Sequence, residues 1–365
     1  MQLGIIGLAR SGKTTVFNAV TRGSAEVGSY SASDRLNVGV VNVPDSRVEA
    51  LTRIYNPKKT TYASIEYVDF PAAGEAFGRG DGPAGKFIND LGRMDAFIHV
   101  VRAFEDESVP HPEVDIDPAR DIETMDLEIA FADLAIIERR LQRIETEMKA
   151  MKPGERAAVQ PLQVLLGRLK GELESGTPIR EQTVTEDDWK LLEGTQFMTA
   201  KELLVLVNIG EEDFERRDQI DSDLNGKFRG VGRALAVIGG KFEMELNELD
   251  GEEAEEFRLS VGVMESGLEE SIRLSYQLLG LISFLTSGED ECRAWSVTRG
   301  ATVPEAAGKI HTDLQRGFIR AEVVAYDDLV KCGSEAEAKK QGLVRTEGKE
   351  YIVEDGDILH ILFNV

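Results

Sequence analysis

The stretch Gly7-Leu8-Ala9-Arg10-Ser11-Gly12-Lys13-Thr14 matches the pattern G-x-x-x-x-G-K-[ST] at every fixed position. The apolar residues 3–6 precede it and predict a buried strand, and residues 15–20 follow it and predict a helix with an apolar face. A glycine loop between a strand and a helix is the context in which this pattern binds phosphate. The sequence therefore predicts a phosphate-binding loop at residues 7–14, called the phosphate loop below.

The residue types of the phosphate loop explain how it would hold a nucleotide. The glycines let backbone N–H groups turn toward phosphate oxygens, and the helix N-terminus adds partial positive charge. Lys13 can reach the β- and γ-phosphates, and the Thr14 hydroxyl can bind Mg²⁺. We expect nucleotide contacts from all eight residues and from Thr15, with Arg10 more often facing solvent than donating charge.

Length and composition narrow the class of protein. A chain of 365 residues with 42% hydrophobic and 30% charged residues predicts a soluble protein of two or three domains. Two cysteines, no long apolar run and no leader-like start predict a cytoplasmic location without a membrane partner. The net charge of −24 argues against nucleic-acid binding by the whole surface, and we expect no specific DNA partner.

Further apolar runs predict an α/β domain. We expect strands at residues 38–43, 62–69, 95–101, 203–207 and 234–238, alternating with helices, and therefore a mostly parallel sheet covered on both faces. Ligands bind at the carboxyl ends of such strands. Asp69 ends the second of these runs, where phosphate-loop proteins hold Mg²⁺, and residues 208–211 and 239–241 follow the last two. His99 is expected to be a packed strand residue.

The hydrophobic period changes from Asp121. The stripe Leu127, Phe131, Leu134, Ile137, Leu141, Ile144, Met148 and Met151 is heptad-like, and a second leucine stripe follows a break at residues 152–154. Together they predict an antiparallel helical hairpin. We expect a nucleotide-binding domain at 1–120 plus 200–280, the inserted hairpin at 121–199, and a strand-rich α+β module with one helix at 281–365.

Two loops could sense the nucleotide. Residues 23–34 are small, polar and without period, and residues 74–85 are rich in glycine. The first follows the phosphate-loop helix and the second follows Asp69. We expect both to respond to the γ-phosphate, although the first could be a simple connector.

With these parts placed, the chain resembles the YchF family, also called Obg-like ATPases, within the translation-factor class of phosphate-loop NTPases, nearly from end to end. The resemblance implies a G-type nucleotide domain, an inserted helical hairpin, a C-terminal β-grasp module of the TGS type, ATP and Mg²⁺ as ligands, and the ribosome or ribosomal RNA as partner. It is carried by residues 7–15, 37–41, 43–45, 67–69, 99–102, 121–123, Asn208 with Glu211, 245–250, 293–295, 306–313, 317–323, 325–328, 348–349, 351–353 and 355–357.

Asn208-Ile209-Gly210-Glu211 stands where related GTPases have Asn-Lys-x-Asp. The aspartate of that motif accepts hydrogen bonds from guanine N1 and N2, and the longer Glu211 cannot make the same bidentate contact without displacing the base. We therefore expect ATP rather than GTP, with base contacts from Asn208, Ile209, Glu211 and Gly239. A GTPase stays an open alternative.

The chain departs from the family pattern in both sensing loops. Ser33 replaces the usual threonine that contacts Mg²⁺ or the γ-phosphate, and Ala32 stands where some members carry a redox-active cysteine. Phe70-Pro71-Ala72-Ala73 replaces Ile-Ala-Gly-Leu after the metal aspartate. Ala72 can still donate its N–H to the γ-phosphate, but Pro71 restricts the rearrangement.

These observations predict a regulatory ATPase with slow intrinsic hydrolysis. Lys13, Thr14 and Asp69 are the expected catalytic residues, and Thr14, Ser33 and Asp69 the expected Mg²⁺ ligands, because phosphoryl transfer needs mainly positioning and charge stabilisation. The alternative is a nucleotide-gated binding module with little hydrolysis, which the Phe70-Pro71-Ala72 departure favours.

Overall fold

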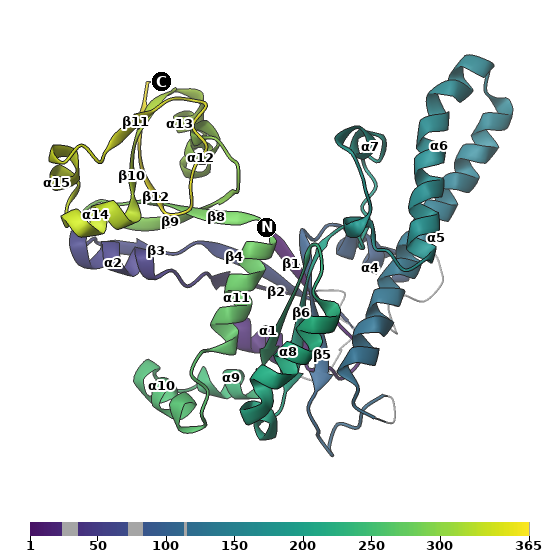
Figure 1. The fold of residues 1–365 in the computed structure, drawn as a ribbon, viewed down its shortest axis with the longest axis horizontal. Helices are drawn as coiled ribbons and strands as arrows, with labels where there is room; N and C mark the ends of the chain where they lie inside the picture. Colours follow the sequence, from purple (N-terminus) through teal and green to yellow (C-terminus); the bar gives the residue numbers. More distant parts are fainter. Residues whose placement is uncertain (24–35, 72–82, 113–114, 365) are drawn as a thin grey trace. The chain divides into compact units, whose positions relative to one another are not determined.

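The computed structural model describes residues 1–23, 36–71, 83–112 and 115–364, with only the backbone at 83–86. The chain forms two compact units. The first unit contains Met1–Gly39 and Tyr67–Ser271, and the second contains Val40–Glu66 and Ile272–Val365. The predicted α/β fold with an inserted helical hairpin and a C-terminal α+β module is confirmed (Figure 1).

The first unit is built on a six-stranded sheet of order β2-β4-β1-β5-β6-β7. The pairs β1–β5, β5–β6 and β6–β7 are parallel. Their side chains are buried almost throughout, because helices cover both faces of such a sheet. The strands are β1 (Gln2–Ile6), β2 (Asn37–Asn42), β4 (Ser64–Asp69), β5 (Ala96–Ala103), β6 (Glu202–Ile209) and β7 (Arg233–Ile238).

Helices follow the strands of the first unit, so that the carboxyl ends of β1, β4, β6 and β7 all lead into loops at one edge of the sheet. The helices are α1 (Lys13–Thr21), α4 (Pro83–Gly92), α5 (Pro118–Ala150), α6 (Pro153–Glu174), η1 (Ile179–Glu181), α7 (Glu186–Leu191), η2 (Glu211–Arg216), α8 (Arg217–Phe228), α9 (Gly240–Leu246), α10 (Gly251–Ser260) and α11 (Gly267–Leu278).

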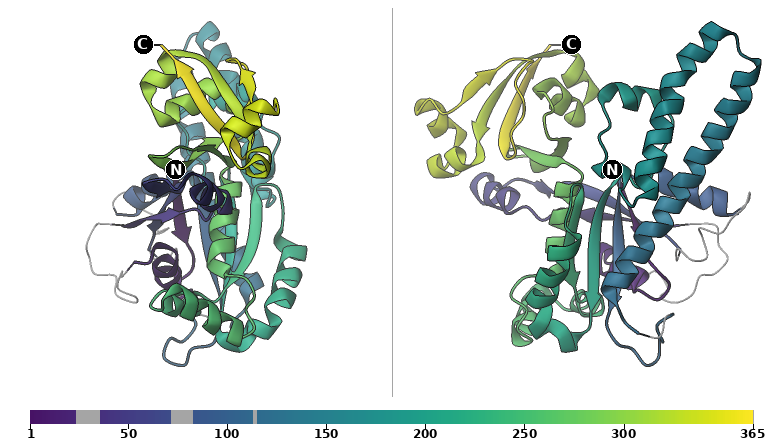
Figure 2. Two further views of the ribbon diagram at one scale, coloured as in Figure 1. Left: turned by 90° about the vertical axis from the view of Figure 1, so that its left-hand side faces the viewer. Right: turned by 45° about the vertical axis from the view of Figure 1, so that its right-hand side comes forward.

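Helices α5 and α6 form the predicted hairpin, which extends away from the sheet (Figure 2). The Asp117 side chain caps α5 by accepting from Arg120 N, and Pro153 opens α6 at a position where its missing N–H costs nothing. The hairpin core joins residues 137 and 144 of α5 to the leucines of α6.

The predicted heptad stripe is wrong in the first half of α5. Leu127 and Phe131 are 57% and 62% exposed. Ile122, Met125 and Ile129 are buried there instead, because this half of α5 packs on the sheet rather than on α6. The stripe holds only where α6 is the neighbour.

The second unit has a mixed six-stranded sheet of order β11-β10-β12-β8-β9-β3, with the parallel pair β12–β8 inside antiparallel neighbours. Helix α12 covers one face, as in a β-grasp module. The elements are α2 (Ser46–Tyr55), β3 (Lys59–Thr61), β8 (Leu281–Thr286), β9 (Glu291–Thr298), α12 (Val303–Ile310), α13 (Thr312–Arg316), β10 (Phe318–Ala325), α14 (Tyr326–Cys332), α15 (Glu335–Lys340), β11 (Arg345–Glu347) and β12 (Asp357–Phe363).

Two features of the second unit differ from the sequence-based expectation. The one helix predicted in the C-terminal module is accompanied by α13, α14 and α15. Residues 40–66, which follow the first sensing loop, pack with the C-terminal residues: β3 pairs in parallel with β9, and Arg47 forms ion pairs with Asp45 and Asp355.

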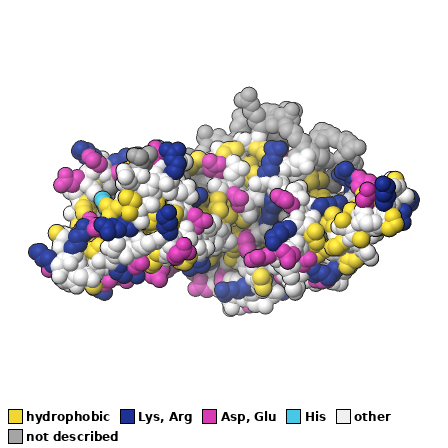
Figure 3. All heavy atoms as spheres, turned by 90° about the horizontal axis from the view of Figure 1, so that it is seen from above, with side chains coloured by type: hydrophobic (Ala, Val, Ile, Leu, Met, Phe, Trp, Pro, Cys, Tyr) yellow, Lys and Arg dark blue, Asp and Glu magenta, His cyan; other side chains and the backbone are white. Residues whose placement is uncertain are grey.

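None of the helices in the described ranges is both long and apolar enough to cross a bilayer. On the face shown in Figure 3, Lys and Arg side chains are interspersed with Asp and Glu side chains and with apolar ones. This face therefore presents mixed charge rather than one continuous basic surface.

Candidate functional site

The phosphate loop connects β1 to α1, and its backbone requires glycine at two positions. Gly7 and Gly12 have φ angles of 155° and 88°. A Cβ on Gly7 would lie 2.5 Å from the Val100 carbonyl oxygen, and one on Gly12 would overlap the Asn208 side-chain nitrogen. The two glycines of the motif are therefore required by close approach as well as by backbone angle.

The N-terminus of α1 is arranged to receive an anion. No side chain caps this helix and its first turn holds no acidic residue, so its terminal N–H groups are directed into the loop. Lys13 is 5% exposed, and its Nζ donates to the carbonyl oxygens of Gly7 at 3.1 Å and Leu8 at 2.9 Å. The ammonium group thus lies inside the loop, where it adds positive charge to that of the helix.

Asp69, at the end of β4, meets the phosphate loop through Thr14. The Thr14 hydroxyl donates to Asp69 Oδ2 at 3.0 Å, and the carboxylate is 3% exposed. Burial raises the pKa of Asp69, which the Thr14 hydrogen bond and the charge of Lys13 partly offset. Asp69 Oδ1 is buried and has no hydrogen-bond partner among the described residues.

This pair of side chains fits a magnesium ion. The unpartnered Oδ1 and the Thr14 hydroxyl are oxygen donors of the kind that Mg²⁺ prefers. Among the described residues no group of three or more His, Cys, Asp or Glu side chains could hold a metal by itself. A site with one carboxylate and one hydroxyl suits an ion that keeps waters and shares phosphate oxygens, and such an ion would neutralise phosphate charge.

Asn208 ties the phosphate loop to the loop after β7. Its side chain is 3% exposed, its Nδ2 donates to Ser11 O at 3.2 Å, and its Oδ1 accepts from Gly240 N at 2.9 Å. Both ends of the amide are therefore engaged by the backbone. The arrangement brings residues far apart in the sequence to one edge of the sheet, as the strand order predicts.

The other predicted base-contact residues, Ile209, Glu211 and Gly239, differ in their exposure and their neighbours. Ile209 is 3% exposed and packs in the core, so only its backbone can face a ligand. Glu211 is exposed at the start of η2. Gly239 lies against the Phe214 ring, which a Cβ would approach to 2.7 Å.

The remaining predicted residues of the loop have varied surroundings. Leu8 packs against the core, Ala9 is exposed, and Thr15 is half-buried in α1. Arg10 has a left-handed φ of 63° and is exposed, and its Nη1 donates to Pro110 O at 2.8 Å. Ser33 and Ala72 lie outside the described residues, so their predicted roles stay predictions.

Arg102 supports the phosphate loop, a role that the sequence reasoning missed. It is 2% exposed at the end of β5, and its guanidinium donates to Phe104 O at 3.1 Å and to Arg10 O at 3.4 Å. A charged residue near the end of a buried strand was the available signal. His99, three residues earlier, is fully buried as expected, and burial lowers its pKa to about 3.

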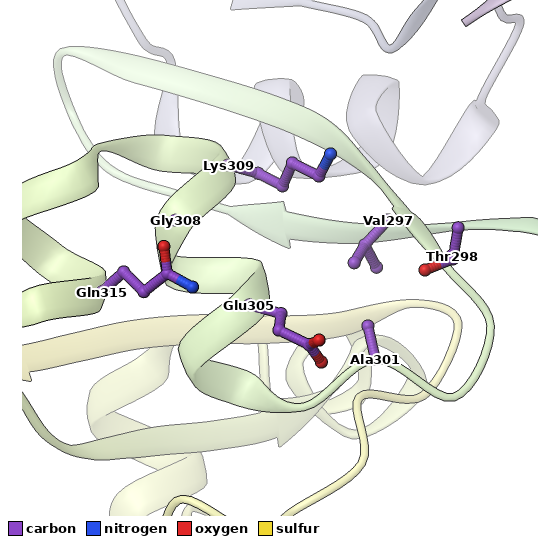
Figure 4. A pocket seen from close by; sticks show the side chains of 7 residues that line it. All are labelled: Val297, Thr298, Ala301, Glu305, Gly308, Lys309 and Gln315. Carbon is purple, nitrogen blue, oxygen red and sulfur yellow. The ribbon is translucent and has the colours of Figure 1, made fainter. Parts of the chain in front are cut away.

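A groove of about 360 Å³ lies in the second unit between β9, α12 and α13 (Figure 4). It is lined by Lys309, Gln315 and Thr298 among others, and by Glu305, whose carboxylate accepts from Thr302 N and Oγ1 and so caps α12. None of the residues predicted to bind nucleotide lines it.

The chain is similar to known proteins over nearly its whole length. Residues 281–364 match the family model YchF-GTPase_C, described as "Protein of unknown function (DUF933)". The chain is 41% identical over 367 residues to "Ribosome-binding ATPase YchF" of Bacillus subtilis and 36% identical over 365 residues to that of Escherichia coli O157:H7, each covering 99% of both chains. It is also similar to the "Structure of the Schizosaccharomyces pombe YchF GTPase", with a TM-score of 0.83, 30% identity, and coverage of 99% of this chain and 97% of that one.

Proposed function

Because the chain belongs to the YchF family, we propose that it is a regulatory ATPase that binds ATP with Mg²⁺ and hydrolyses it slowly in association with the ribosome. The single observation that carries this proposal is the Thr14–Asp69 hydrogen bond beside the buried Lys13 ammonium, with Asp69 Oδ1 unpartnered among the described residues. It is the donor set that a magnesium nucleotide requires.

The residues of the site would act by position and charge. Lys13 would exchange its carbonyl contacts for phosphate oxygens, and Thr14 and Asp69 would hold the metal ion, with Ser33 as a further proposed ligand. The bases available are poor: His99 is buried with a pKa lowered to about 3, and it faces no solvent. Slow intrinsic turnover follows, since water would be positioned by backbone groups or by a partner.

The proposed partner and base rest on different arguments. The bacterial relatives are named ribosome-binding ATPases, which supports a ribosomal partner in the cytoplasm, either protein or RNA. Adenine is supported by Glu211 in place of the guanine-binding aspartate. The fission-yeast neighbour is called a GTPase, so guanine is the competing base and GTP the competing nucleotide. The proposal includes a nucleotide-binding domain at 1–120 plus 200–280, an inserted hairpin at 121–199 and a C-terminal module at 281–365.

Single-turnover hydrolysis of ATP with and without purified ribosomes tests the function. We expect slow phosphate release that ribosomes stimulate. Lys13→Ala should abolish nucleotide binding, whereas Lys227→Ala, an exposed lysine on α8, should leave it unchanged. Absence of stimulated release would favour the nucleotide-gated binding module, to which the Phe70-Pro71-Ala72 departure points. Tighter binding of GDP than of ADP would defeat the adenine assignment.

A further inference from the structure

Helix α10 has no buried residue, unlike the other helices of comparable length for which burial is described in the first unit. It lies beside α9 at the lower edge of the view in Figure 1. Its attachments are the Phe257 ring, stacked on Phe242 at 5.9 Å, and the half-buried Ala254 and Arg258. A ten-residue helix is marginal in water without tertiary packing. Another surface covering α10 would therefore stabilise it.

The side of α10 turned away from α9 combines an apolar side chain with carboxylates. Leu259 is 46% exposed, and Glu256, Glu255 and Glu252 precede it by three, four and seven residues, which places all four on one helix face. We call these four residues the acidic face. Its glutamates form no ion pair with another described residue, and Glu252 and Glu256 repel each other at i,i+4 spacing.

Further exposed apolar side chains flank this helix. Phe257 is 47% exposed on α10 itself, and Leu249 and Met264, just before and after it in the chain, are 41% and 76% exposed. Large apolar side chains gathered in one short segment and bordered by charge mark protein interaction sites. The charge that borders these apolar side chains is negative, because residues 252, 253, 255 and 256 are glutamates.

We propose that the acidic face docks a basic protein segment in which lysine or arginine residues flank an apolar anchor. The anchor would cover Leu259, and its cations would pair with Glu252, Glu255 and Glu256 and remove their mutual repulsion. Phosphate groups would be repelled, so the occupant is a protein rather than RNA. This inference rests on the proposed ribosome association and specifies that this face meets a ribosomal protein.

A photo-cross-linking residue, benzoylphenylalanine, placed at position 259 of the full chain tests the proposal with purified ribosomes and ATP. We expect a cross-linked product that protease destroys and ribonuclease leaves intact. Glu252→Lys/Glu256→Lys should lower its yield about tenfold, the equivalent of roughly 1.4 kcal/mol. The control Glu145→Lys/Glu193→Lys changes the net charge equally at exposed positions outside α10 and should leave the yield unchanged.

The other results overturn the proposal in distinguishable ways. A ribonuclease-sensitive product would show that RNA occupies the face. Normal co-sedimentation with ribosomes without a protein cross-link would defeat this inference and leave the proposed function standing. Loss of co-sedimentation in every variant, including the unmodified chain, would defeat both. Nucleotide binding by the α10 variants reports that they are folded, since α10 holds no residue of the nucleotide site.

Discussion

Asp69 and Asp133 are both buried aspartates of the first unit, but their surroundings differ. Asp133 is fully buried in α5, where Oδ1 accepts from Met198 N at 2.9 Å and Oδ2 accepts from Thr199 N and Oγ1 at 2.7 Å each. Asp69 accepts from the Thr14 hydroxyl and interacts with the Asn37 side chain, and its buried Oδ1 has no geometric hydrogen-bond partner in the described part of the chain.

The difference separates a structural carboxylate from one prepared for a ligand. Three donors saturate Asp133, which joins α5 to the segment leading into β6 at the base of the hairpin. A buried acceptor without a partner has a cost in free energy, and that cost is recovered when a cation arrives. The unpartnered Oδ1 of Asp69 therefore fits a ligand-binding role, whereas the saturated carboxylate of Asp133 fits a structural one.

Replacing Asp133 should have the largest effect on folding. Asp133→Ala leaves three buried donors without an acceptor, and we expect the free energy of unfolding of the first unit to fall by about 3 to 5 kcal/mol. Urea unfolding monitored by far-UV circular dichroism measures this change. Asp126→Ala, also on α5, is a control that removes one ion pair, the one with Arg233, and should lose less. Equal losses in the two variants would refute the structural role.

The pH dependence of stability should report Asp133 separately. Burial raises its pKa to about 6 from 3.8, so the folded state binds more protons than the unfolded state between these values. The contribution of Asp133 to stability is therefore greatest below pH 3.8 and falls as the pH rises to about 6, by roughly 2 to 3 kcal/mol. The difference in unfolding free energy between the wild type and Asp133→Asn, followed from pH 4 to 7, measures this fall. A flat difference would contradict it.

Asp69→Asn should affect ligand binding rather than folding, in contrast to the Asp133 variants. The amide oxygen can still accept from Thr14, so we expect unfolding to change little, while Mg²⁺-dependent ATP affinity falls about 10- to 100-fold. Calorimetric titration of ATP with Mg²⁺ and with EDTA measures the metal-dependent part. Retention of the full Mg²⁺ effect in this variant would remove Asp69 from the metal site and break the contrast with Asp133.

The same contrast explains what could be read from the sequence. The phosphate loop is local: eight consecutive residues carry its motif, and Asp69 is recognisable because it ends an apolar strand. The strands of the sheet could also be predicted, because each one is a local run of apolar residues. Asp133 gave no signal, because its partners lie at positions 198 and 199 and come together only in the folded chain.

Tertiary context also explains the errors. The heptad stripe assigned Leu127 and Phe131 to the hairpin core, but α5 changes its neighbour from the sheet to α6 along its length, and a single period cannot describe both contacts. The β3–β9 pairing joins residues about 230 apart in the chain, at Lys59 and Glu291, and leaves no local pattern. Arg102 was visible as a charged residue near the end of a buried strand, but its partner Arg10 O was not.

A third carboxylate, Glu211, extends the comparison to an exposed group and should have the smallest effect. Glu211→Asp restores the side-chain length of the guanine-binding motif next to Asn208, which is already held by Ser11 O and Gly240 N. We expect the ratio of GDP to ADP affinity to rise about tenfold, within the range of one additional charge-assisted hydrogen bond pair. Equilibrium titration with both nucleotides measures it, and Glu212→Asp is the matched control one residue away. Because Glu211 is exposed, stability should not change, so a shift in base preference can be attributed to recognition. An unchanged ratio would mean that the backbone of residues 208–211 selects the base instead.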